Sequence, residues 1–235
     1  KQAVTIDIKS NANARFSNFD LGTTNLPESK AIDNNHTETL ALSVKPETGL
    51  VLVDRVTKLS GHYKADTQKS LISFEDFYES ERKEFGMEKS LVEDLSDGRK
   101  TKKFAEELGA ALLEIRNKKK DKFLAEAKDW FDLEITDIDN YKLQNLGIRH
   151  NKPDFVYSSS FKMGGLLKKA GNNYILEIGK LQGTPLAISE QQRKRSLDVY
   201  MPFARSFTTK ITLKIPEGYT VEGLAALNKK VENET

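Results

Sequence analysis

The sequence predicts an α+β fold, mainly β: an antiparallel β-sandwich with a helical insertion or linker of about four helices in the middle. Two observations support this class. Apolar and polar residues alternate toward both ends of the 235-residue chain, and glycine and proline turns separate the alternating stretches. In the middle, apolar residues recur every three or four positions, which is typical of amphipathic helices.

The change of spacing divides the chain into three regions. These are an N-terminal β region (1–64), a helical insertion or linker (65–131) and a C-terminal β-sandwich region (132–235). A chain of this length can bury roughly three-quarters of its unfolded surface, which suits one large domain or two small ones. The helical block is therefore either an insertion in one sheet domain or a linker between two small β domains.

The N-terminal region begins with an alternating strand at residues 3–9. Residues 11–33 are rich in Asn, Ser, Thr, Gly and Pro and are typical of an extended loop or a short edge pairing. A second alternating strand covers residues 39–45, and Pro46–Gly49 forms a turn into a return strand that runs toward Gly61. Two strands joined in this way require a third for stability.

The helical block begins with a stripe of apolar residues from Leu71 to Phe85. Ser73 and Asp76 have the spacing of an N-cap pair, and Gly86 can end the helix. Because the residues outside the apolar stripes are charged, each helix is expected to pack through one face only. Three further helical segments follow at residues 91–95, 104–115 and 123–131.

The C-terminal region returns to strand patterns near residues 141–145, 155–161 and 174–178. The clearest strand is 207–215, where one face carries Phe207, Thr209, Ile211, Leu213 and Ile215 and the residues between them are Thr and Lys. Pro216–Gly218 then supplies a tight turn, and the alternation restarts at Tyr219 and Val221. This stretch therefore predicts a hairpin with one buried and one solvated face.

Composition narrows the possible functions. The net charge is only +2, from 37 basic and 35 acidic residues, so nucleic acid is not an expected partner. The chain has no cysteine, which removes disulfides, thiolate nucleophiles and cysteine-ligated zinc. No run of 18 apolar residues exists, so no membrane span is expected. The start at Lys1 and the abrupt end lead us to expect a segment of a longer parent protein.

Candidate reactive residues are few. Ser159 and Lys162 match the S-x-x-K pattern of serine acyltransferases, but the flanking alternation predicts a strand, which sends them to opposite faces. The three histidines, His36, His62 and His150, lack metal-ligand spacing. We therefore assign no catalytic, cofactor-binding or metal-binding residue, and we expect no cofactor and no enzyme activity from this segment.

Three other motifs in the sequence are weaker. The glycines near Gly179 and Gly183 lack the spacing of a phosphate loop. Asn35 and Asn233 begin glycosylation sequons, which matter only in a eukaryotic secretory route. Tyrosines in the β regions could hold sugars or peptides by stacking, although tyrosine also suits a half-buried strand. These are Tyr63, Tyr157, Tyr174, Tyr200 and Tyr219.

Two stretches carry a family resemblance: DFVYSSSFKMGGLLKKAGNNYILEIGKLQG and RKRSLDVYMPFARSFTTKITLKIPEGYTVEGL. They resemble the C-terminal β-rich region of bacterial secreted proteins that combine an N-terminal β-sandwich of unknown function with a transglutaminase-like papain-fold domain. The resemblance covers residues 133–235 most clearly, and extends more faintly to 36–40 and 49–63. It rests on the strand pattern and on the PEGYTVE turn.

This resemblance implies an accessory role. Transglutaminase-like catalysis uses a cysteine nucleophile with His and Asp, and this chain has no cysteine. The implied function is a non-catalytic domain that supports or positions the catalytic domain of its own parent protein, in the periplasm or at the cell surface. The alternative is an independent glycan- or peptide-binding β-sandwich module.

Overall fold

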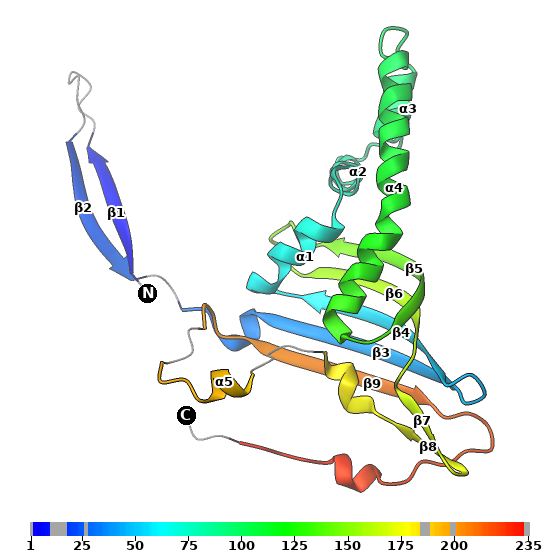
Figure 1. Ribbon diagram of the computed structural model, residues 1–235. Helices are drawn as coiled ribbons and strands as arrows, with labels where there is room; N and C mark the ends of the chain where they lie inside the picture. The colour runs from blue at the N-terminus through cyan, green and yellow to red at the C-terminus, as the bar shows by residue number, and fades with distance from the viewer. Residues whose placement is uncertain (1, 10–17, 26–27, 184–188, 198–200, 233–235) are drawn as a thin grey trace.

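The computed structural model describes residues 2–9, 18–25, 28–183, 189–197 and 201–232 (Figure 1). Strands and helices are mixed along the chain. The strands are β1 Gln2–Lys9, β2 Asn18–Asn25, β3 Asn35–Lys45, β4 Leu50–Leu59, β5 Ile135–Leu146, β6 Phe155–Met163, β7 Leu167–Ala170, β8 Asn173–Leu176 and β9 Ser206–Lys214. The α-helices are α1 Lys64–Leu71, α2 Phe74–Glu84, α3 Leu91–Ser96, α4 Lys102–Phe131 and α5 Glu190–Arg193.

A five-stranded sheet with the order β5-β6-β4-β3-β9 forms the centre of the fold. Neighbouring strands are antiparallel except for β3 and β9, which run parallel. The strands come from both ends of the sequence, so residues 64–131 lie between two strands of the same sheet, β4 and β5. The helical block is thus inserted into one sheet rather than linking two. The pairs β1-β2 and β7-β8 form separate two-stranded sheets.

The helix α4 covers one face of the five-stranded sheet. Phe123, Ala127 and Phe131 of its second half are buried against inward-facing residues of the strands, among them Leu40 and Phe155. Burial alternates strictly along β6, as expected for a strand with one face toward a core. The first half of α4 extends away from the sheet and packs against α3 (Figure 1).

The predicted sandwich is not confirmed. Among the described residues, a helix and not a second sheet packs on the five-stranded sheet, and its opposite face is solvent-exposed (Figure 1). The fold is therefore mixed α and β, because the insertion contributes one of the two layers. Antiparallel sheets commonly keep one solvated face, and the alternating pattern that predicted the strands does not reveal what covers the buried one.

The predicted hairpin after residue 207 is wrong. The strand β9 and the turn are confirmed, and the amide of Tyr219 donates to the carbonyl of Pro216. Tyr219 and Val221, however, lie in no strand and are exposed. The strand β9 pairs instead with β3 in parallel, with Asn35 opposite Ser206. Parallel pairing joins distant segments, so local alternation cannot reveal it.

In the helical insertion, the predicted start of α2 is confirmed, but the predicted break between the last two helical segments is wrong. Ser73 caps α2 as expected: its hydroxyl accepts from the amide of Asp76, and its own amide donates to the Asp76 carboxylate. The two predicted segments 104–115 and 123–131 form one helix, α4, because the polar residues between them include no glycine or proline.

The apolar stripe of α2 faces solvent rather than a core. Phe74 and Phe85 are both more than half exposed. The first turn of α2 is tied to α4 by ion pairs from Glu75 to Arg116 and from Asp76 to Lys119. Leu71, the first residue of the predicted stripe, is buried in the core, so the expectation of inward packing is wrong only for the part of the stripe from Phe74 onward. No helix in the described part of the chain is long and apolar enough to cross a bilayer.

Candidate functional site

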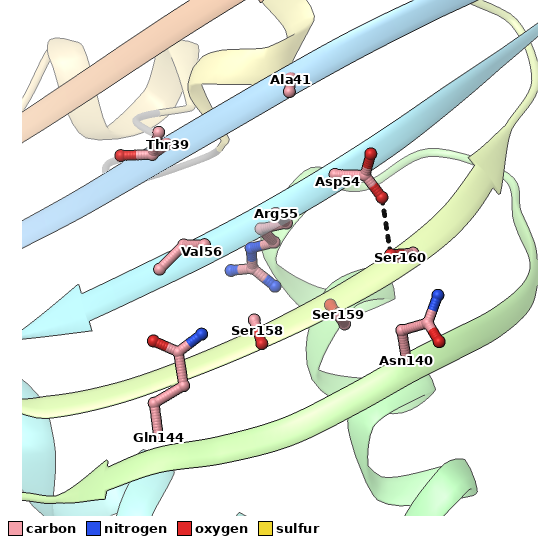
Figure 2. Close-up of a pocket in the computed structure, with 10 residues that line it drawn as sticks. All are labelled: Thr39, Ala41, Asp54, Arg55, Val56, Asn140, Gln144, Ser158, Ser159 and Ser160. Atoms are coloured by element: carbon pink, nitrogen blue, oxygen red, sulfur yellow. Dashed lines mark hydrogen bonds between the residues drawn. The ribbon is translucent and has the colours of Figure 1, made fainter.

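The solvated face of the five-stranded sheet carries a shallow depression with a volume of about 330 Å³ (Figure 2). It lies over strands β3, β4, β5 and β6, where side chains alternate between the helix and the solvent. The polar groups around it are a carboxylate, two amides and several hydroxyls. They include Asp54, Asn140, Gln144, Ser158 and Ser160. The Ser160 hydroxyl donates to the Asp54 carboxylate at 2.6 Å.

Small side chains make the centre of this face flat. Thr39 and Ala41 on β3 lie beside Val56 and Asp54 on β4, which in turn lie beside Ser158 and Ser160 on β6. None of these side chains is large enough to stand far above the sheet. A second layer of protein, or an extended ligand, could therefore approach the backbone closely.

A network of buried charges lies on the other side of the sheet, beneath α4. Arg55 on β4 is fully buried and donates two hydrogen bonds to Glu38 on β3, at 2.7 and 2.8 Å. It donates two more to Glu126 on α4, at 2.6 and 3.0 Å. The hydroxyl of Tyr157 donates to Glu126 at 2.7 Å, and the hydroxyl of Thr57 donates to Glu38. These bonds join three strands to the helix.

His36 closes the network at its other end. Its Nε2 lies 2.7 Å from Oε1 of Glu38, and its ring stacks on Trp130 of α4 with centroids 3.9 Å apart. The indole of Trp130 also contacts Gly183, where a β-carbon would lie 2.5 Å from a ring atom. Helix, strand and the loop after residue 182 therefore meet at this one indole.

The pKa values of the network follow from burial and from the charge of Arg55. Burial alone raises the pKa of Glu38, but the charge of Arg55 and hydrogen bonds from Arg55 and His36 outweigh burial and lower the pKa to about 2. Burial lowers the pKa of Arg55, and Glu38 with Glu126 outweigh this and raise it. Burial raises the pKa of the Tyr157 hydroxyl well above its usual range, against the opposing charge of Arg55. The ionised pairs are thus strongly favoured.

The geometry assigns this network to holding the fold together. Arg55 is fully enclosed and its hydrogen bonds go to protein carboxylates, so it has no donor directed at a solvent-filled space. The net contribution of a buried ion pair to the free energy of folding is small, but removal of one partner is strongly destabilising. The network therefore fixes the position of α4 on the sheet. Within the described ranges, no group of three or more His, Asp or Glu residues is placed to hold a metal ion.

The structure separates the residues of the S-x-x-K pattern. Ser159 is buried on the helix-covered side of β6, whereas Lys162 points to the other side and pairs with Asp137 at 3.0 Å. A serine and a lysine on opposite faces of one strand cannot exchange a proton. The acyltransferase hypothesis is therefore wrong, as the strand pattern had predicted.

The remaining motif residues are scattered. His62 stacks on Phe203, and His150 is exposed. Gly179 lies in a short 3₁₀ helix at Ile178–Gln182, and Thr184 lies outside the described residues. The Asn35 amide donates to the Ser206 hydroxyl at 2.8 Å, so a glycan there would break a contact between β3 and β9. The second sequon, 233–235, lies outside the described residues.

The tyrosines do not form a stacking platform among the described residues. Tyr157 is buried beneath α4, and Tyr63 is half-buried beside His36. Tyr174 and Tyr219 meet edge to face, with ring centroids 5.9 Å apart. Tyr200 lies outside the described residues. The tyrosines that the structure describes therefore form no glycan-stacking surface on the solvated face of the sheet.

The charged network was missed by sequence reasoning, although the sequence carries a signal for it. In both β3 and β4, charged residues occupy the buried phase of the alternation: Glu38 lies in phase with Leu40 and Leu42, and Arg55 lies in phase with Val53. A charge at such a position requires a buried partner of opposite sign.

Comparison of the chain with protein-family models, curated proteins and solved structures finds no match.

Proposed function

We propose that this chain is a non-catalytic accessory domain that positions a second protein domain on the solvated face of its sheet. By the resemblance of residues 133–235, that domain is the transglutaminase-like catalytic domain of the same parent protein. The β-sandwich that the strand pattern predicts would then be completed by the docked domain. A periplasmic or cell-surface location belongs to the same proposal.

The observation that carries the proposal is the flat, one-sided exposure of the sheet. The helix α4 and the buried charges of Arg55 hold the sheet from one side, while the small side chains of Thr39, Ala41 and Ser158 line the centre of the other side. The core of a protein interface packs as densely as a protein interior, and a surface centre without protruding side chains permits such close contact. The buried network has a supporting role in this function and no role in chemistry.

The gene provides a first test. We expect the open reading frame that encodes this chain to encode also a papain-fold domain with Cys, His and Asp in a triad. A reading frame without such a domain would overturn the assignment of the partner. This result would leave the docking face itself to be tested with other domains of the same reading frame.

A binding experiment tests the face. Isothermal titration of the chain with that papain-fold domain should give binding, and Ser158→Arg should abolish it, because the arginine would stand in the centre of the flat face. The matched control is Ser96→Arg, which places the same change on the exposed side of α3. Equal binding by both variants would contradict docking on this face.

A polar ligand on the same depression is the second candidate function. The amides of Asn140 and Gln144 and the carboxylate of Asp54 supply donors and acceptors of the kind that bind peptides or glycans. A glycan and peptide array should then give signals that disappear in the Asn140→Ala, Gln144→Ala double variant. Signals that persist in this variant would rule out the depression as their source.

A further inference from the structure

The two edges of the five-stranded sheet are built differently. At one edge, β5 pairs with β6 through three register shifts, and Asp137 and Asn140 adopt left-handed backbone conformations there. Such bulges bend a strand and discourage further pairing. At the other edge, β9 pairs with β3 in an unbroken register over nine residues, from Ser206 to Lys214. One edge is therefore irregular and the other is regular.

The outer edge of β9 has no partner among the described residues. In the strand order, β9 is terminal and pairs with β3 alone. Residues 219–232 follow it, yet none of them makes a backbone hydrogen bond with β9 in the described part of the chain. A row of backbone donors and acceptors on a regular strand is a template for another strand.

The side chains of β9 indicate which kind of strand could pair with its free edge. On the helix side of the sheet, Phe207 is 39 % exposed, and Ile211 and Leu213 contact the core while remaining only partly buried. A neighbouring strand with apolar side chains on that side would cover them. On the solvated side, Lys210 and Lys214 are exposed and form no ion pair with the described residues.

We propose that the free edge of β9 binds an extended segment of a partner protein by strand addition, and that this segment alternates acidic with apolar residues. The acids would face Lys210 and Lys214 across the strands, and the apolar residues would cover Phe207 and Ile211. Opposite charges on facing positions stabilise a strand pair, and the backbone hydrogen bonds supply sequence-independent affinity.

The lysines also decide against a second copy of this chain as the occupant. Pairing of β9 with its own copy would bring lysines together on one face of the joined sheet, and like charges across strands are destabilising. Edge lysines of this kind discourage pairing with another strand unless its charges offset theirs. An acidic strand is the class that they favour.

The experiment uses the whole chain, ¹⁵N-labelled, and the synthetic peptide TVEVTVEVT, whose glutamates have the four-residue spacing of Lys210 and Lys214. We expect the peptide to shift the amide resonances of residues 206–214 and to slow their hydrogen exchange. The charge-reversed peptide TVKVTVKVT and the rearranged peptide TVVETVEVT, which has the composition of the probe but places its two glutamates on opposite faces, should bind at least about tenfold more weakly.

Variants of the chain complete the test. Lys210→Glu with Lys214→Glu should weaken binding of TVEVTVEVT by about tenfold and should restore binding of TVKVTVKVT. The matched control, Lys142→Glu with Lys152→Glu, places the same charge change on exposed lysines near the other edge and should leave both affinities unchanged.

Three results would overturn the proposal: no shifts in residues 206–214, shifts centred on β5, or equal binding of the acidic and basic peptides. The docking of a domain on the solvated face is a separate matter. Ser158→Arg should leave peptide binding at the β9 edge intact, so failure of one proposal can be told from failure of the other.

Discussion

Arg55 occupies a position from which water is excluded, and its charge is compensated there by carboxylates from two different elements. Moving an ion out of water costs several kcal/mol, and close partners with satisfied hydrogen bonds offset that cost. Glu38 is itself buried, whereas the Glu126 side chain is 15 % exposed. Removal of Arg55 would therefore leave at least one carboxylate buried without a counter-charge.

Arg55→Ala should lower the free energy of unfolding by about 3–5 kcal/mol, since it breaks a buried ion pair on one side only. Urea denaturation measures this loss. The control is Lys118→Ala, which breaks an exposed pair with Glu114 on α4 and should change stability by about 0.5 kcal/mol or less. A loss below about 1 kcal/mol for Arg55→Ala would show that the network is not held together by charge.

The lowered pKa of Glu38 predicts a dependence of stability on acid. Its folded-state pKa of about 2 lies below the ordinary value of 4.5, so its ionised form stabilises the fold above pH 4.5. This contribution is lost as the pH falls through 2. Glu38→Gln removes the ionisation, so the difference in unfolding free energy between the native chain and this variant should be largest near neutral pH.

Urea denaturation of both proteins at several pH values between 7 and 2 measures that difference. It should shrink toward zero as Glu38 becomes protonated in the native chain, because a protonated glutamate and a glutamine are nearly alike. Other carboxylates titrate in both proteins and cancel. A difference that stays constant with pH would contradict the ionised state of Glu38.

At the residue scale the sequence predicted which face of a strand a side chain occupies, but not which side chains pair. The strand pattern around Ser159 correctly predicted that Lys162 lies on the opposite face. The partner of Arg55 could not be predicted, because Glu38 and Glu126 lie in different elements and many acids were available. Which acid meets a buried base is decided by tertiary packing.

At the scale of elements, the sequence predicted the features that depend only on neighbouring residues, such as helix starts and tight turns. The capping pair Ser73 and Asp76 starts α2, and Pro46–Gly49 joins β3 to β4. The partner of β9 is distant in the sequence, and α4 continues through a polar stretch that no residue interrupts. Pairing between remote strands and the joining of helices are therefore the two features that sequence patterns left undetermined.

Trp130 links α4 to the segment after β8, and Gly183 is the residue that allows the contact. Gly183 has φ 72° and ψ −170°, a region that is nearly restricted to glycine, and a β-carbon there would lie 2.5 Å from the indole. Gly171 also has a positive φ, of 64°, but has open space around it. Substitution of these two glycines therefore distinguishes the cost of backbone strain, present at both, from the cost of steric contact, present only at Gly183.

Gly171→Ala should cost about 1 kcal/mol through its backbone alone. Gly183→Ala should cost about 2–3 kcal/mol, because displacement of the indole adds to the strain. Trp130 is the only tryptophan of the chain, so its fluorescence emission should shift in Gly183→Ala and stay unchanged in Gly171→Ala. Equal costs with no spectral shift would contradict the contact.

At the scale of the whole molecule, stability is concentrated in the five-stranded sheet and α4. The hairpin of β1 and β2 lies apart from them (Figure 1). Val4 and Ile6 on β1 and Leu21 on β2 are 60–69 % exposed, and Ile6 lies directly opposite Leu21. Because an isolated two-stranded hairpin is marginal in water, this pair adds little to the stability of the sheet.

Removal of residues 1–27 should therefore change the free energy of unfolding by about 0.5 kcal/mol or less, whereas removal of residues 206–235 should destabilise the chain strongly. The second deletion removes β9 and uncovers β3, whose Leu40 and Leu42 lie opposite Ile211 and Leu213. Thermal and urea unfolding of the two truncated chains measure both effects. A large loss from the first deletion would show that the hairpin packs on the sheet in solution, and its exposed apolar residues would then be part of the core.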